Sequence, residues 1–257
     1  MKKLLLSSFI LLVSSASFAQ FGSLSLSLGL PQNEFRQNTD ATGFGGDLTF
    51  GIPFQKGAPI FFGLDFNYLV YGSNSQEETL RAQITLENGV RIGDPLEIPL
   101  EIRNTNSIFG THAFIRVQAP FELVQPYIEG LIGFRYISTN VKILDLSDDN
   151  RWSEPDNNVI VRETVLDDWV FSYGYGGGFM IKLGANFFVD LRADFFIGQR
   201  AKFFDGDDTS SWNIEFSGDP TNFDEETVTG ENLSFSTVAR ESTTDLLMLK
   251  LGIAYKI

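Results

Sequence analysis

Charged residues occupy alternate positions in several segments of this chain, and they are the first candidates for chemistry. Asp190, Arg192 and Asp194 follow one another at two-residue spacing, and Arg116 and Glu129 flank a short turn. Alternate residues of a β-strand point to the same face, so these charges would share a face opposite large apolar side chains. We predict an internal ion-pair network formed by Asp65, Arg116, Glu129, Arg135, Asp190, Arg192 and Asp194. The alternative is an ion-selective path lined by the same charges.

The single histidine, His112, is the other candidate for chemistry. It lies about six residues into a predicted strand, which is roughly 15–20 Å at the usual rise, and no motif pairs it with a serine. We interpret it as an internal hydrogen-bonding group rather than a general base. The sequence therefore predicts no catalytic residue, no enzyme activity and no cofactor.

The segment 205–231 contains nine acidic residues and no lysine or arginine. Asp205, Asp207 and Asp208 have the oxygen-rich character of a calcium ligand set, but the spacing of a full calcium-binding loop is missing, so no metal site is predicted. We expect a solvated loop, with Trp212 beside these acids as a candidate contact or cation-binding residue. Its ligand cannot be identified from the sequence.

The composition excludes several classes of protein. No cysteine is present, so disulfides and thiolate metal sites are excluded. The formal net charge is -14, and it becomes about -16 without Lys2 and Lys3, which argues against nucleic acid or anionic lipid as a partner.

The first 19 residues have the features of a secretory signal peptide. Lys2 and Lys3 precede an apolar run, and small residues precede a cleavage site after Ala19. The run is too short to span a bilayer. We predict a signal peptide at 1–19 and one domain at 20–257.

Alternating hydrophobicity dominates the rest of the chain and predicts an all-β fold. Eight segments carry apolar residues at alternate positions, opposite glycines and polar residues: 23–30, 44–54, 60–70, 108–117, 127–136, 169–183, 187–197 and 247–257. They are joined in turn by long loops (31–42, 72–106, 141–167 and 200–243) and by short turns near 55–57, 119–121 and 184–186. This pattern indicates an eight-stranded antiparallel transmembrane barrel with short periplasmic turns and long extracellular loops. A soluble β-sandwich or lipocalin-like barrel is the alternative, but it would place the large apolar residues inside.

The chain resembles the small outer-membrane barrels typified by OmpA and OmpX, over nearly all of its length and for the barrel domain only. The resemblance rests on the signal peptide, the alternating strands and the end Leu251-Ile253-Tyr255-Ile257. It implies insertion into the bacterial outer membrane by the barrel-assembly machinery, contact with outer-membrane lipids, and outward-facing acidic loops. The family often ends in an aromatic residue, whereas this chain ends in Ile257.

One segment leaves the number of strands open. Residues 80–86 and 90–102 alternate on either side of Asn88-Gly89, which is a strong hairpin signal. A membrane hairpin would give ten strands. The absence of aromatic residues from 72 to 107, together with Pro95 and Pro99, favours a hairpin that projects outside the membrane.

These observations favour a monomeric outer-membrane barrel with a structural or adhesion-like role. Its extracellular ligand is unknown. A small porin-like channel is one alternative. A lipid A-modifying barrel enzyme, as some small barrels are, is another, and it would need His112.

Overall fold

Eight long strands close into a barrel in the computed structural model, which describes residues 21–39, 41–55, 57–85, 91–146, 159–205, 214–216, 233–235 and 239–256. The order around the barrel is β1-β12-β7-β6-β5-β4-β3-β2, with every neighbouring pair antiparallel. The strands are β1 (Phe21–Pro31), β2 (Gly43–Pro53), β3 (Ile60–Thr85), β4 (Arg91–Gln118), β5 (Val124–Asp145), β6 (Val159–Lys182), β7 (Phe187–Gly198) and β12 (Leu246–Lys256). The predicted eight-stranded barrel is confirmed. The predicted signal peptide lies outside the described residues.

Registered neighbours show how steeply the strands are tilted. Starting at Trp169 on β6, paired residues run through β5, β4, β3, β2, β1, β12 and β7, and return to β6 at Phe179, ten residues further along. A stagger of this kind requires tilted strands and leaves an interior that side chains can fill.

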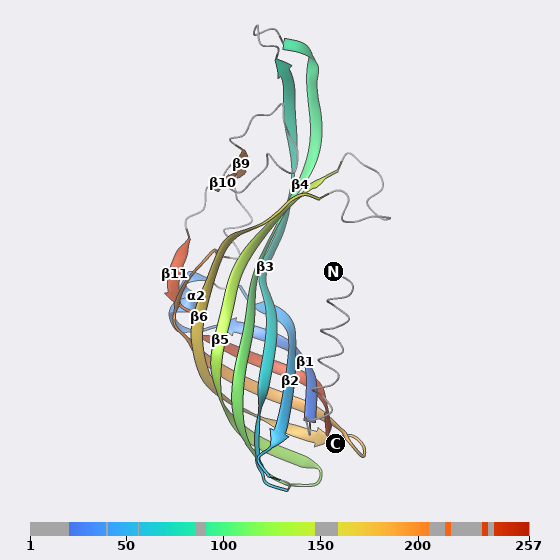
Figure 1. Ribbon diagram of the computed structural model, residues 1–257, viewed down its shortest axis with the longest axis vertical. Helices are drawn as coiled ribbons and strands as arrows, with labels where there is room; N and C mark the ends of the chain where they lie inside the picture. Colours follow the sequence, from blue (N-terminus) through green and yellow to red (C-terminus); the bar gives the residue numbers. More distant parts are fainter. Residues whose placement is uncertain are drawn as a thin grey trace.

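The hairpin after Gly72 projects beyond the barrel, as expected. Pairing of β3 with β4 continues as far as Thr85 and Arg91, whereas β2 pairs with β3 only as far as Val70. Figure 1 shows this hairpin extending far above the barrel. Pro99 does not interrupt the pairing of the hairpin strands, since it pairs with Thr79, whereas Pro95 has no registered partner and lies at the register shift between Ala82 and Ile84. Pairing of β4 with β5 ends at Leu100, so Pro99 lies at the start of an edge, where proline is tolerated.

The predicted loop boundaries also need correction. Residues 141–145 and 159–167 were expected in a loop, but they extend β5 and β6 and pair with each other. The polar cross-strand pairs that stabilise this extension, such as Thr164 with Asn140, lie beyond the apolar pattern that marks a membrane strand.

Shorter elements lie in two of the predicted loops. They are α2 (Asn33–Asn38), β8 (Arg200–Phe203), β9 (Ile214–Phe216), β10 (Leu233–Phe235) and β11 (Arg240–Thr243), with β8 paired to β11 and β9 to β10. The sequence predicted no helix here. A helix of six residues shows no apolar period, and tertiary packing stabilises it through Phe35, which is buried.

The barrel has its large apolar side chains outside and its charges inside. Leu26 is 74% exposed and Ile128 is 69% exposed, whereas Asp65 and Arg116 are fully buried. A soluble barrel would show the reverse arrangement, so the outer face of these strands is suited to hydrocarbon. Among the described residues, no helix is long and apolar enough to cross a membrane.

Aromatic residues mark both edges of this apolar face. Tyr68, Phe109, Tyr136 and Trp169 are registered neighbours on β3 to β6, and they form a row at the end nearer the long loops. At the other end, the rings of Phe187 and Tyr255 are 5.1 Å apart. Such rows are typical of the two interfaces of an outer-membrane barrel, and they agree with the predicted location in the outer membrane.

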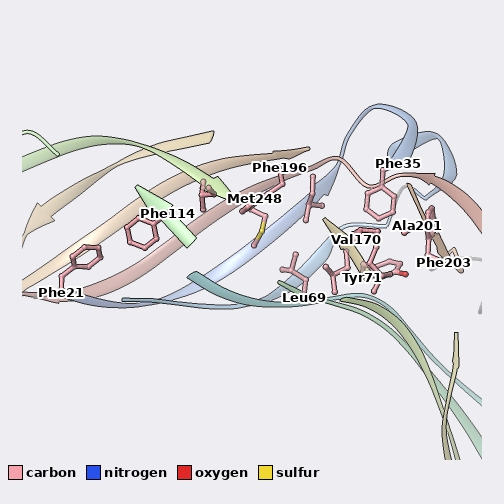
Figure 2. Close-up of a cluster of buried hydrophobic side chains, with 14 residues drawn as sticks. Phe21, Phe35, Leu69, Tyr71, Phe114, Val170, Phe196, Ala201, Phe203 and Met248 are labelled. Carbon is pink, nitrogen blue, oxygen red and sulfur yellow. The ribbon is translucent and has the colours of Figure 1, made fainter. Parts of the chain in front are cut away.

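Apolar side chains also fill parts of the interior, on either side of the charges. Figure 2 shows Phe21 and Phe114 at one end of the buried cluster, Phe196 and Met248 in the middle, and Phe35 and Phe203 among the residues at the other end. Phe114, which the sequence pattern left unassigned, therefore faces the lumen.

Candidate functional site

The lumen holds a continuous ion-pair network at mid-height, with Arg192 of β7 at its centre. The Arg192 guanidinium contacts the carboxylates of Asp47, Asp65, Glu129 and Asp194, which come from β2, β3, β5 and β7. Its distances to the Asp65, Glu129 and Asp194 oxygens are 3.0, 3.3 and 3.4 Å. One side chain thus connects four strands across the barrel interior.

Lys250 of β12 is the second cation of the network. Its Nζ lies 2.5 Å from Asp47 Oδ2, 3.2 Å from Asp65 Oδ2 and 3.0 Å from Asp194 Oδ2. All of these side chains are fully buried. None of these side chains is reached by solvent, so the network is buried within the lumen.

Arg116 lies on the periplasmic side of the network. Its Nη2 is 2.7 Å from Glu129 Oε2, and its guanidinium carbon lies 3.8 Å from the centre of the Tyr127 ring. The Tyr127 hydroxyl donates to Asp190 Oδ1 at 2.6 Å. Asp190 therefore joins this group through a hydrogen bond.

The structure places all seven predicted network residues in the lumen, but they do not all belong to one network. Asp65, Glu129, Arg192 and Asp194 share the network, and Arg116 joins through Glu129. Three members were not in the predicted set: Asp47, Thr49 and Lys250. Each lies on the polar face of an alternating segment, which was the available signal. The alternation of apolar and polar residues shows which face of a strand a side chain occupies, but it does not show which residue that side chain contacts.

Arg135 is the exception within the predicted set. It is fully buried and donates to Thr244 Oγ1 at 3.2 Å, with its guanidinium carbon 5.9 Å from the centre of the Phe196 ring. Among the described residues, no carboxylate lies within ion-pair distance of it. Arg135 therefore belongs to a separate layer between the network and the outer mouth.

His112 lies in this same layer and is buried. Its Nε2 is 2.6 Å from the hydroxyl of Ser172, and its ring lies 4.5 Å from that of Phe196. Ser172 is 60 residues away in the sequence, and it lies on β6 in the same registered row as His112, with only Gly133 of β5 between them. Both side chains are buried, and the interpretation of His112 as an internal hydrogen-bonding group stays a prediction.

Substitution of His112 by alanine is expected to lower the free energy of unfolding by about 1–3 kcal/mol. The Ser172 hydroxyl would lose its partner, and a cavity would form beside Phe196. Denaturant titration of the refolded barrel measures this, with Ser172→Ala as the smaller matched change. The mass spectrum of lipid A from cells that carry the variant should equal that of the wild type. A missing or added acyl chain that depends on His112 would contradict a purely structural role.

The helix α2 and the paired strands β8 and β11 form a cap at the outer mouth of the barrel. Phe35 of α2 packs edge-on against Phe203 of β8, with ring centres 5.0 Å apart. The Glu34 carboxylate accepts the backbone N–H of Thr243 at 3.0 Å and pairs with Arg200 at 3.1 Å. These contacts hold the pKa of Glu34 below its usual value, with the Thr243 hydrogen bond as the main cause. The cap closes the lumen a second time.

The acidic segment is described only in part. Asp205 lies at the mouth, 3.0 Å from Arg240, and is nearly buried. Asp207, Asp208 and Trp212 lie outside the described residues. Within the described part of the chain, no group of three or more acidic, histidine or cysteine side chains could hold a metal ion.

Above the mouth, β3 to β6 continue as an extracellular sheet with two different faces. The inward face is buried, with Asn106 and Val141 both at 0% exposure. The outward face is continuous with the apolar outer face of the barrel. Registered rows on it pass from Ser107 and Ser138, through Thr105, Asn140 and Thr164, to Arg103, Lys142 and Arg162. Ser107 and Ser138 are buried, and the Arg103 guanidinium lies 2.7 Å from the carboxylate of Glu101 on the same face.

Comparison with known proteins finds similar solved structures but no related sequence. No protein-family model and no curated protein sequence matches the chain. Similar solved structures include the attachment invasion locus protein Ail of Yersinia pestis in complex with the heparin analogue sucrose octasulfate, with 11% identity, a TM-score of 0.39, and coverage of 92% of this chain and 97% of Ail.

Two further structures have comparable similarity. Neisserial surface protein A has 10% identity and a TM-score of 0.39, with coverage of 92% of this chain and 96% of the other. A major outer membrane protein from Thermus thermophilus has 14% identity and a TM-score of 0.38, with coverage of 92% and 99%. Similarity at this level carries no information about function, so the function has to be inferred from the residues of this chain.

Proposed function

We propose that this protein is a monomeric outer-membrane barrel with a closed lumen that presents a β-sheet outside the cell for contact with a partner. The observation that carries the proposal is the continuation of four barrel strands beyond the aromatic row, above a lumen that fully buried charges close. The barrel then acts as a rigid support for the sheet.

The rigidity of the support follows from the lumen. The strands that carry the sheet, β3 to β6, provide Asp65, Arg116, Glu129 and Ser172 to the interior contacts described above. A channel would need an open path through these contacts, and an enzyme would need an accessible reacting group. The buried ion pairs of the lumen support a structural role, so the proposal assigns the function to the external sheet.

The outward face of the sheet is the proposed contact surface. Ser73, Ser75, Arg103, Arg162 and Thr164 are exposed on it, and Asn140 and Lys142 are partly exposed. Exposed hydroxyl, amide and charged groups on a rigid sheet, with Arg103 paired to Glu101, are suited to a hydrated partner that carries hydroxyl groups, such as a polysaccharide.

Removal of the projecting hairpin tests the proposal. Residues 74–104 can be replaced by Asn-Gly, because Ser73 and Thr105 are registered partners that a two-residue turn can join, and this change removes Ser75 and Arg103 from the contact surface. Barrels in nanodiscs are then applied to an array of immobilised polysaccharides and extracellular proteins. We expect the wild type to bind at least one of them and the shortened barrel to lose binding at least tenfold.

Two controls make the result decisive. The shortened barrel must keep the wild-type gel shift between boiled and unboiled samples, which reports a folded barrel. A point variant, Arg103→Ser with Lys142→Ser, should weaken binding without shortening the sheet. Equal binding by the wild type and both variants, or no binding by the wild type to any surface, would contradict the proposal.

A further inference from the structure

The outer face of the barrel is hollowed over β6, β7, β12 and β1. A groove of about 730 Å³ lies there, and its exposed lining is almost entirely apolar. Its floor is the registered pair Gly177 and Ala193, where two small residues replace the large side chains found in the rows on either side. Phe179 and Leu191 form the row below, and Tyr175 and Phe195 form the row above.

The groove continues from β6 and β7 towards β1 and β2. The row of Gly177 and Ala193 extends through Leu249 and Leu28 to Phe44 on β2. Because the strands are steeply tilted, this row runs obliquely across the apolar face, from its middle towards its outer edge. A groove with this position is filled by hydrocarbon whenever the barrel is in a membrane.

A second, smaller hollow of about 250 Å³ lies beyond the outer end of this row. It is lined by Leu30, Pro31, Gln32, Arg36 and Thr42. Leu30 follows Leu28 on the outward face of β1, and Thr42 comes two residues before Phe44, so the smaller hollow lies one outward position further along these strands than the groove. The lining changes from apolar to polar where β1 ends and β2 starts. The exposed Arg36 of α2 lies at this place.

Arg36 is placed for an anionic head group. It is exposed, and α2 holds it just outside the apolar face, whereas the acidic Glu34 of the same helix is occupied by Arg200 and Thr243. Residues two positions apart on a helix do not face each other, so Glu34 does not compete for the same hollow. Guanidinium groups bind phosphate well, because their planar N–H groups match its oxygens.

We propose that these two hollows form one lipid site, with an acyl chain in the groove over Gly177 and Ala193 and a lipid phosphate at Arg36. The site opens at the end of the barrel that carries the cap and the extracellular sheet, so the lipid is a phosphate-bearing glycolipid of the outer leaflet. The net charge of the chain does not prevent this, since exposed charges further away than a Debye length, about 8–10 Å, are largely screened.

Native mass spectrometry of the barrel tests the site. Wild-type protein is reconstituted with diphosphoryl lipid A, or with the same lipid A after removal of both phosphates, and the retained lipid is counted after exchange into detergent. We expect one retained diphosphoryl lipid per barrel and at least fivefold less of the dephosphorylated form. Ala193→Phe fills the groove and should abolish retention of both forms. Arg36→Gln should lower retention of the diphosphoryl form to that of the dephosphorylated form, so that the preference for phosphate is lost.

Matched variants separate the site from general effects. Ile132→Phe adds a ring on the lipid-facing side of β5, and Lys202→Gln removes an exposed cation from β8; both should behave as the wild type. Ala193→Val is a milder change for use if Ala193→Phe fails to show the gel shift of a folded barrel. Retention that is unchanged in the Ala193 variant that folds, or a phosphate preference that survives Arg36→Gln, would overturn the proposal. The binding array described above does not depend on this result, so each proposal can fail separately.

Discussion

Replacement of Arg192 by methionine is expected to destabilise the folded barrel by about 3–5 kcal/mol. Four buried carboxylates contact its guanidinium, and Lys250 alone would remain to balance Asp47, Asp65 and Asp194. A buried charge without its partner keeps its desolvation cost, so the loss exceeds that of an exposed pair. Urea titration of the barrel in lipid vesicles, followed by the gel shift of unboiled samples, measures the change.

Arg200→Met is the matched control for this prediction. Arg200 also contacts two carboxylates, Glu34 and Glu241, but all three side chains are about half exposed. Its loss should move the unfolding midpoint much less. Equal shifts for the two variants would show that the lumen network does not stabilise the barrel.

In planar bilayers, the wild type should give no discrete conductance, because the network and the cap both close the lumen.

The second large effect is expected at Gly45, where alanine should destabilise the barrel by about 1–3 kcal/mol or prevent its assembly. A methyl group at Gly45 would lie 1.7 Å from the backbone carbonyl oxygen of Tyr68 on the neighbouring strand. Backbone atoms cannot rotate away as a flexible side chain does, so β2 and β3 would have to separate locally. The fraction of protein that refolds into lipid vesicles measures the effect.

The adjacent Gly46 provides the control. It points to the other face of β2, and the nearest atom to an added methyl group there is the Ser25 carbonyl oxygen at 3.7 Å, an ordinary contact. Gly46→Ala should therefore refold as the wild type does. If both variants refolded equally well, close packing at Gly45 would not limit the approach of β2 to β3.

The closed lumen has a layered arrangement that explains these costs. Aromatic rings at the periplasmic end surround Arg116, the ion-pair network follows at mid-height, and the layer of His112 and Arg135 lies below the cap. Apolar rings next to charges lower the local dielectric, which strengthens each ion pair and raises the cost of breaking it. This is consistent with a barrel that supports an external sheet and does not conduct.

The sequence by itself determined the architecture of this protein, because the period of two is a local property of each strand. Leu24, Leu26 and Leu28 already indicate one apolar face, and long and short connections in turn predict which end carries the projecting hairpin. The need to close a sheet in lipid then leads to a barrel. The polar faces of the strands also predicted that Asp65 and Arg192 lie inside, since each stands opposite apolar neighbours on its own strand.

Only the tertiary structure decided the partners and the hollows. Arg192 and Asp47 are 145 residues apart, and they meet because the stagger of ten residues around the barrel sets their relative height. The hairpin register of β6 and β7 brings Gly177 beside Ala193, and pairing through β12 aligns both with Leu28. The α2 helix was missed for a related reason: contacts of Phe35 with Tyr71 and Phe203, far away in the sequence, stabilise it. Local patterns predict which face a side chain occupies, whereas register and closure decide what it touches.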